Sequence, residues 1–293
     1  MKGYLRIIIL VISITVLFSG CRQAREVFSY QGIIFEGFDP AKHQPSDEFH
    51  LYIRPEKVVL SAQDIKSLRR CVDLMKQKNL MHLLKYPNRF VIANSSYSFA
   101  DKPQMVIYLD KEKINLDFTI SDDWKNKLLN SNLSLMEKSN RFAFRGTPEL
   151  PNLLRIMLHE IGHLVEYEQL KFNWKGKFYE NELNKDFVTI SWNRSDNWKD
   201  REGFRGKVQG IHSVEGLVTF FQWFKQDSSF LSLSSSMGMN EDFAEAFAYY
   251  YLIRYYNYKN SFLLDGTVLI DNLQASNPLR DQKLAFIAGV MGE

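Results

Sequence analysis

The sequence predicts an α+β protein whose second half is mostly helical. Segments rich in Val, Ile, Tyr and Phe predict strands in the first part of the chain. These strands are expected at residues 49–53, 89–93 and 104–109. Helical periodicity dominates later, at residues 151–170 and 240–258. Strands in one lobe followed by helices in the other are typical of the α+β class, and 293 residues suffice for one large domain.

Residues 1–20 have the features of a bacterial lipoprotein signal peptide. Lys2 and Arg6 precede an apolar run at residues 7–18, which is too short to cross about 30 Å of hydrocarbon comfortably. Small residues then lead to Cys21, and this ending resembles signals in which the cysteine sulfur receives a diacylglycerol. An ordinary secretory signal with an incidental cysteine is the alternative. We expect lipidation of Cys21 and a location in the bacterial cell envelope, outside the cytoplasm and anchored to a membrane.

Charge and cysteine content exclude several classes of protein. Without the signal peptide the chain has 35 basic and 34 acidic residues, so it is nearly neutral. A neutral chain lacks the electrostatic footprint of nucleic-acid binding, and we expect no nucleic-acid partner. Two cysteines are too few for a disulfide framework or a thiolate metal cluster. With Cys21 lipidated, Cys71 is expected to be a small buried hydrophobe in a helix.

The first lobe is expected to mix its strands with helices. Residues 21–48 form a tether that ends in a strand leading into the domain. Ser61 predicts a helix start, because Asp64 follows three residues later as in a capping box, and Pro87 ends the helical pattern. A further helix capped at Ser121 is expected to run towards residue 139.

The second half is expected to hold two long helices on either side of an insertion. Pro151 suits the first turn of the helix at 151–170, where its missing N–H is not needed. The aromatic-rich insertion at 171–239 contains four tryptophans, which we interpret as a satellite core under long loops. A substrate-contacting lid is the alternative interpretation. In the helix at 240–258, Phe243 and Phe247 share an apolar stripe.

The segment His159-Glu160-Ile161-Gly162-His163 is a metal-binding signature if it is helical. Two histidines four residues apart project from one helix face, so both can reach one Zn²⁺ at about 2.0–2.1 Å. Glu160 lies beside them and can act as a general base towards a metal-bound water. Because the surrounding residues are apolar, an unpartnered His-Glu-His set would be costly to bury. Two core histidines satisfied by backbone acceptors are the alternative.

A catalytic zinc ion needs a third protein ligand and keeps one position open. A third histidine six residues after His163 is excluded, since Gln169 stands there. Glu241 and Glu245 are four residues apart and lie on one face of the predicted helix. One can bind zinc while the other accepts a hydrogen bond from a ligating histidine; we take Glu241 as the ligand and Glu245 as the supporting carboxylate. Taken alone, these residues and Asp242 also fit a solvated acidic face.

Together, the segments at 159–163 and 241–247 resemble the gluzincin zinc metallopeptidases, most of all the catalytic domain of anthrax toxin lethal-factor-type peptidases. The resemblance covers only these two segments. It implies a zincin-like fold, with a small mixed sheet, an active-site helix and a helical C-terminal half, and it implies Glu241 as the third zinc ligand. That family has an oxyanion-stabilising tyrosine shortly before this Glu, whereas residues 233–239 contain none. His212 or a tyrosine from elsewhere would then take its role.

We therefore expect residues 49–293 to form a zinc-dependent endopeptidase domain that binds one Zn²⁺. Glu160 would be the general base, and the substrate would be a protein or peptide. We expect the strand at 104–109 to offer its edge to an extended substrate. The alternative is a zinc-containing envelope lipoprotein that binds a partner and has weak or no catalytic activity.

Overall fold

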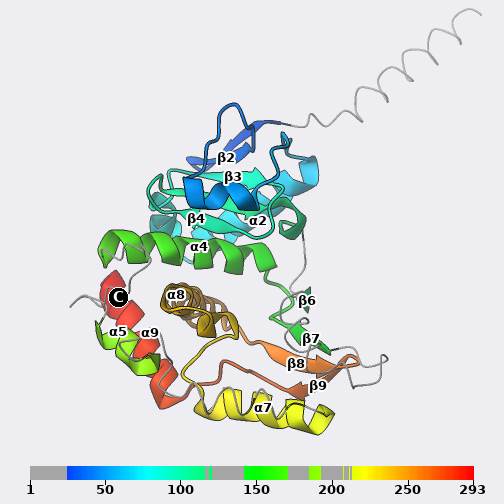
Figure 1. Ribbon diagram of the computed structural model, residues 1–293, viewed down its shortest axis with the longest axis vertical. Helices are drawn as coiled ribbons and strands as arrows, with labels where there is room; N and C mark the ends of the chain where they lie inside the picture. Colours follow the sequence, from blue (N-terminus) through cyan, green and yellow to red (C-terminus); the bar gives the residue numbers. More distant parts are fainter. Residues whose placement is uncertain are drawn as a thin grey trace, which may run out of the picture.

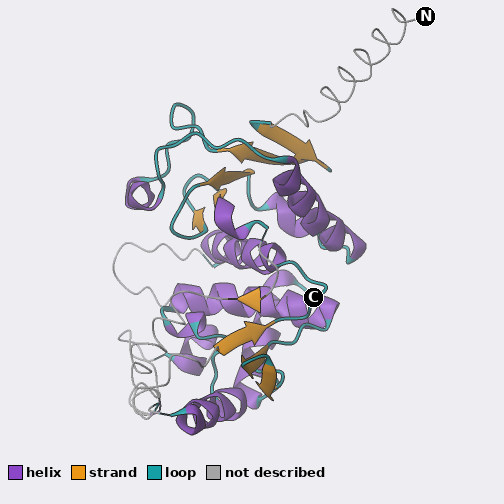
Figure 2. Cartoon of the chain, turned by 90° about the vertical axis from the view of Figure 1, so that its right-hand side faces the viewer, coloured by secondary structure: helices purple, strands orange, loops and turns teal. Residues whose placement is uncertain are grey.

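The computed structural model of the protein describes residues 25–115, 119–120, 142–170, 185–192, 207, 211 and 213–293. Within these ranges the chain is α+β, as predicted, and strands lie above and below a central layer of helices (Figure 1, Figure 2). Cys21, the signal segment before it and the helix predicted after Ser121 lie outside the described residues. None of the helices in the described part is both long and apolar enough to cross a bilayer.

A five-stranded mixed sheet forms the first lobe. Its strands are β1 (Val27–Tyr30), β2 (Ile33–Gly37), β3 (Arg89–Ala93), β4 (Phe99–Asp101) and β5 (Val106–Asp110). They follow the order β1-β2-β3-β5-β4; β2, β3 and β5 are parallel, and the two outer strands are antiparallel to their neighbours. The predicted strands at 89–93 and 104–109 are therefore confirmed, whereas the strands within residues 21–48 are β1 and β2, which lie in the middle of this range and not at its end.

The strand predicted at residues 49–53 is wrong. This segment belongs to a 3-10 helix, η1 (Asp47–Tyr52), beside the sheet. The ring of Phe49 stacks on that of Phe99 in β4, with centroids 4.6 Å apart. A single aromatic side chain can pack against the end of a sheet without backbone hydrogen bonds to a neighbouring strand. Alternation of apolar and polar residues over five positions is therefore compatible with a 3-10 helix as well as with a strand.

The expectation that the strand at 104–109 offers a free edge is also wrong. β5 pairs with β3 on one side and with β4 on the other. The three-residue strand β4 ends the sheet instead, with Phe99 opposite Tyr108. β4 also contacts the helix at 151–170, beside which it lies in Figure 1.

The helix predicted after Ser61 is α2 (Ala62–Gln77), and its capping box is present. The Asp64 backbone N donates to the Ser61 hydroxyl over 3.1 Å, and the Ser61 backbone N donates to the Asp64 carboxylate over 2.8 Å. Cys71 is completely buried in this helix, as predicted, and burial raises the pKa of its thiol. Two 3-10 turns follow in the first lobe, η2 (Met81–Lys85) and η3 (Lys111–Lys113).

Two long helices cross at the centre of the molecule. They are α4 (Asn152–Gln169) and α8 (Met239–Tyr256), within about two residues of the predicted bounds, with Pro151 at the N-cap of α4. Asn257, in the left-handed conformation with φ 49°, ends α8. α4 lies between the first sheet and α8 (Figure 1).

A second lobe supports α8 from below. Its antiparallel sheet follows the order of β6 (Thr119–Ile120), β7 (Phe142–Arg145), β8 (Ser261–Leu264) and β9 (Thr267–Ile270). Its helices are α5 (Lys185–Ser191), α7 (Val214–Asp227), η4 (Ser234–Ser236) and α9 (Pro278–Met291). Trp192 is buried there against Phe230, and Trp223 packs on Phe220, which supports the satellite-core interpretation for the described part of the insertion.

Candidate metal centre

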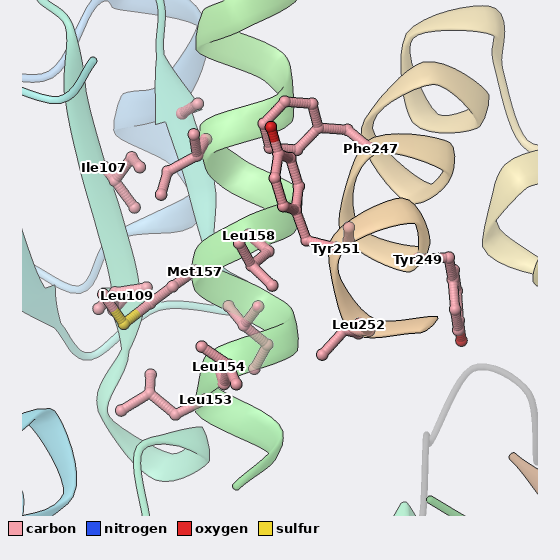
Figure 3. Packing of buried hydrophobic residues seen from close by; sticks show 14 of the residues in the cluster. Ile107, Leu109, Leu153, Leu154, Met157, Leu158, Phe247, Tyr249, Tyr251 and Leu252 are labelled. Carbon is pink, nitrogen blue, oxygen red and sulfur yellow. The ribbon is translucent and has the colours of Figure 1, made fainter. Parts of the chain in front are cut away.

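The position of α4 is fixed by packing on two sides. Met157 lies near Leu109 of β5 on the side of the first sheet, whereas Phe247 and Tyr251 belong to α8 on the other side (Figure 3). All four residues are buried. Contacts on both sides hold the rotation of α4 about its axis, and so fix the direction in which its polar residues project.

Small residues let α4 and α8 approach closely. A Cβ added to Gly162 would stand 3.0 Å from the Cα of Ala244 and 3.1 Å from the Cβ of Phe247. Only a residue without a side chain fits this crossing without a shift of one helix. The two helices therefore cross closely, and this brings the first turn of α8 over the histidines of α4.

Three predicted ligand residues meet at this crossing. One ligand atom each from His159, His163 and Glu241 lies within 4.8 Å of the others. The Glu241 carboxylate oxygens are 3.3 Å from Nε2 of His159 and 3.5 Å from Nε2 of His163. In a tetrahedral zinc site with bonds near 2.1 Å, neighbouring ligand atoms lie about 3.4 Å apart. The donor set, two imidazoles and one carboxylate, and its spacing both fit a zinc ion.

Glu245 occupies the supporting position predicted for it. Its Oε1 lies 3.1 Å from Nδ1 of His159, the ring nitrogen that does not face Glu241. Arg155, one turn earlier on α4, donates to the same Oε1 over 3.0 Å. A carboxylate behind a ligating histidine sets the orientation of the ring and leaves Nε2 for the metal.

The predicted acidic residues of α8 do not form a solvated face. Asp242 and Glu245 are 0% and 1% exposed, and Glu241 alone of the three is partly open to solvent. The alternative of histidines paired with backbone acceptors also fails, because both ring Nε2 atoms approach a carboxylate. Nδ1 of His163 is buried and has no hydrogen-bond partner among the residues that the structure describes.

The positive and negative charges of these side chains balance one another. Burial would lower the pKa of His159, but the carboxylates of Glu241 and Glu245 outweigh burial and raise it to about 10. Burial lowers the pKa of His163 to about 4, against the opposing effect of Glu241. Burial would raise the pKa of Glu241, but the two histidines hold it well below its usual value. A proton on His159 thus supplies positive charge that a divalent cation can replace.

Glu160 lies beside the ligands with a carboxylate suited to exchange protons near neutral pH. It is 4% exposed, and its Oε2 is buried without a hydrogen-bond partner in the described part of the chain. Burial raises its pKa to about 7; His159 lowers the pKa and Glu241 raises it further. A carboxyl group with this pKa can both accept and return a proton during turnover.

One buried residue near the site was not identified from the sequence. Glu166, seven residues after His159 on α4, is buried, and Nζ of Lys102 lies 3.9 Å from its Oε2. Burial raises the pKa of Glu166 to about 8. Its spacing from His159, about two helical turns, is the signal that could have found it.

No family model, curated protein or solved structure matches this chain. The function is therefore inferred from the geometry of the site and from the two short motifs that form it.

Proposed function

We propose that the protein is a zinc-dependent endopeptidase of the gluzincin type. One observation carries the proposal: His159, His163 and Glu241 converge within ligand distance of one another, directly beside the buried carboxylate of Glu160. Three ligands and a neighbouring base are the parts that metal-assisted hydrolysis requires. We propose a zincin-like fold on the same grounds, since the site spans two helices next to a mixed sheet.

A bound zinc ion would polarise the peptide carbonyl and make a nearby water more acidic. Glu160 takes a proton from the attacking water as its oxygen forms a bond to the carbonyl carbon. The electron pair of the carbonyl moves to its oxygen, which becomes an oxyanion. When that pair reforms the double bond, the C–N bond breaks and the leaving amine receives the proton from Glu160. Glu245 and Arg155 keep the ring of His159 in place throughout.

The substrate is an extended stretch of protein or peptide. β4 ends the first sheet and contacts α4, so it is the strand of this sheet beside which a substrate can lie close to the site. A peptide added along β4 would be held by backbone hydrogen bonds and would cross α4 near His159 and His163. We thus propose β4, rather than residues 104–109, as the strand beside which the substrate binds.

The lipid anchor is the second part of the proposal. A diacylglycerol on Cys21 would hold the enzyme at a membrane of the bacterial envelope, with residues 25–293 outside the cytoplasm. Cys21→Ser should release the protein from the membrane fraction, and intact-mass analysis should show loss of the lipid. A Cys21→Ser protein that stays with the membrane would contradict the anchor without affecting the endopeptidase proposal.

Glu160→Gln tests the catalytic proposal. The variant should bind zinc as the wild type does, while cleavage of a broad peptide library falls by about 10²–10⁴-fold, the usual contribution of a general base. Glu168→Gln, an exposed change on the same helix, is the matched control and should retain activity. Metal content measured on the same samples separates loss of the base from loss of the ion.

The second candidate is a zinc-containing binding lipoprotein with weak or no turnover. The absence of a tyrosine at residues 233–239 favours it, because removal of one oxyanion donor lowers a rate by about 10²–10³-fold. If the wild type and Glu160→Gln both bind zinc and neither cleaves any peptide in the library, this alternative is established.

A further inference from the structure

We propose that the protein rests on the phospholipid surface with the β1–β2 edge of its first sheet, so that the candidate metal centre faces away from the bilayer. The partner of this edge is the membrane that carries the lipid of Cys21. The inference rests on the proposed lipid anchor and deepens the proposed function, because the orientation decides which substrates the site can reach.

The chain between the lipid-bearing residue and the folded body is short. Arg25 already belongs to the fold: its N donates to the carbonyl O of Leu60 over 3.1 Å, and the N of Leu60 donates to the carbonyl O of Arg25 over 2.9 Å. Residues 22–24 alone separate Cys21 from Arg25, and four residue steps span at most about 14 Å even when fully extended. With a lipid on Cys21, the part of the fold around Arg25 therefore lies close to the membrane surface.

The order of the strands places the metal centre on the far side of this lobe. β1 begins two residues after Arg25 and forms one edge of the sheet, whereas β4 forms the other edge. Adjacent strands lie about 4.8 Å apart, so four strand spacings separate the two edges by about 19 Å. β4 contacts α4, which carries His159 and His163. In Figure 1, β2 lies at one end of the molecule, α4 and α8 lie in the middle, and α7 and β9 lie at the other end.

The side chains of the β1–β2 edge suit a membrane interface. Val27 in β1 and Ile34 in β2 are 54% and 40% exposed. The antiparallel register makes them diagonal neighbours on one face of the two strands, and the buried Phe28 and Phe35 occupy the opposite face. Single exposed aliphatic side chains are ordinary on a protein surface. At the tethered edge, however, they stabilise contact with the boundary between headgroups and acyl chains.

This orientation defines the class of substrate. With β1 at the membrane, the width of the sheet holds the crossing of α4 and α8 about 20 Å from the bilayer surface. A scissile bond has to reach this height before the metal centre can act on it. The substrates are therefore soluble proteins, or flexible segments that extend well beyond the surface, and peptide bonds next to the headgroups are out of reach.

Fluorescence quenching by a labelled lipid tests the orientation. The chain has two cysteines, and because Cys71 is completely buried and the sulfur of Cys21 carries the lipid, a thiol-reactive dye labels only a cysteine introduced at the surface. Ile34→Cys is compared with Val268→Cys, an exposed aliphatic position in β9 at the opposite end of the molecule. The lipidated protein is bound to vesicles of phosphatidylethanolamine and phosphatidylglycerol that contain a lipid with a nitroxide on its headgroup. The dye at residue 34 should lose most of its fluorescence, and the dye at residue 268 should lose none.

A third position distinguishes this orientation from one in which the first lobe lies on its side. Leu51 is 89% exposed in η1, and η1 packs Phe49 on Phe99 of β4, so this turn belongs to the far edge of the sheet. Leu51→Cys should keep most of its fluorescence. A flexible spacer of about 20 residues inserted before Arg25 has a mean reach of about 25 Å and should restore the fluorescence at residue 34 while the protein stays on the vesicles.

Two lipid-linked peptides test the substrate class. The best library peptide is attached to a lipid headgroup either directly, with its scissile bond next to the headgroup, or through a flexible spacer of about 20 residues, with a mean reach of about 25 Å. The zinc-loaded wild type on the same vesicles should cleave the spaced peptide and leave the directly linked one intact. Cys21→Ser, which is free to turn in solution, is the matched control and should cleave both.

The outcomes separate the inference from the proposals on which it rests. If the protein carries its lipid and residue 34 is not quenched, or residue 51 or 268 is quenched as strongly, the orientation is refuted while the anchor and the endopeptidase stand. Equal cleavage of both lipid-linked peptides by the wild type would refute the substrate class. A Cys21 that carries no lipid would refute the anchor and the orientation together and leave the endopeptidase standing. If no library peptide is cleaved, the endopeptidase and the substrate class are refuted, and quenching still decides the orientation.

Discussion

Nζ of Lys283 in α9 lies 2.6 Å from Oδ1 and 2.5 Å from Oδ2 of Asp242, and both side chains are completely buried. Nε1 of Trp192 donates to the same carboxylate over 3.0 Å. Burial raises the pKa of Asp242 and lowers that of Lys283, while the attraction between the two opposes both shifts. Because Asp242 directly follows Glu241, this pair fixes the turn of α8 that presents the carboxylate of the metal centre.

Lys283→Met should destabilise the protein by about 3–5 kcal/mol, because it leaves the Asp242 carboxylate buried without its partner. Urea unfolding followed by far-UV circular dichroism measures the change. The double variant Lys283→Met, Asp242→Leu should recover much of the loss, since replacing both charges removes the uncompensated one. A single variant as stable as the wild type would show that the pair does not hold α8.

Glu241→Ala should lower the zinc occupancy of purified protein strongly, because it removes one of three ligands. Glu245→Ala should weaken zinc affinity by only about 10–100-fold, through the orientation of His159. Zinc titration against a competing chelator separates the two effects. Unchanged metal content in Glu241→Ala would require another ligand, for which Glu215, Glu182 and His212 are the next residues to test.

Gly162→Ala should push α4 and α8 apart, since the new methyl group would meet the backbone of Ala244 at 3.0 Å. We expect a loss of about 1–3 kcal/mol in stability and a weaker affinity for zinc, because Glu241 moves away from the histidines. Gly289→Ala in α9 is the control: nothing lies within 4 Å of its added Cβ, and alanine favours a helix by about 1 kcal/mol. Similar behaviour of the two variants would contradict the close crossing.

Hydrogen exchange tests which strand the bound substrate lies beside. Binding of a peptide inhibitor should slow exchange in β4, at Phe99–Asp101, and should change β5 little, because both edges of β5 are already paired. New protection in Val106–Asp110 without any in β4 would contradict binding of the substrate along β4.

Glu166 should make the zinc-free protein less stable as the pH rises. Its pKa is about 8 when folded and about 4.5 as a free side chain, so between these values the unfolded chain loses a proton that the folded chain keeps. Glu166→Gln should therefore gain stability over the wild type at pH 8, by about 1 kcal/mol or more, and little at pH 4. Urea unfolding at both pH values, with Glu168→Gln as exposed control, gives the comparison. A gain that is equal at both pH values would contradict the shift.

The helices and the pairing of His159 with His163 on one helix face were predictable because local signals determine them. The capping box at Ser61 and Asp64 and the periodicity of residues 151–170 and 240–258 need no knowledge of distant contacts. The spacing of His159 and His163 likewise requires only that the segment be helical. These features are properties of short stretches of chain, and the structure agrees with each of them.

The remaining features depend on partners far away in the sequence. β4 has three residues, too few for a periodic pattern, and its presence is what places β5 inside the sheet. The burial of Asp242 depends on Lys283, 41 residues later. The spacing of residues in the sequence does not predict such contacts, so only the three-dimensional structure shows them.

The division of the candidate ligands between α4 and α8 bears on when the protein can acquire its metal. An unfinished chain that ends before residue 241, or one still unfolded during transport, presents at most His159 and His163, and two imidazoles on an unformed helix hold zinc weakly. High affinity arises only after the two lobes have docked, and each bound ion then favours the docked state. For a chain exported as we propose, zinc loading would follow folding and draw on the zinc outside the cytoplasm, so the proposed peptidase would be inert towards proteins of the compartment that makes it.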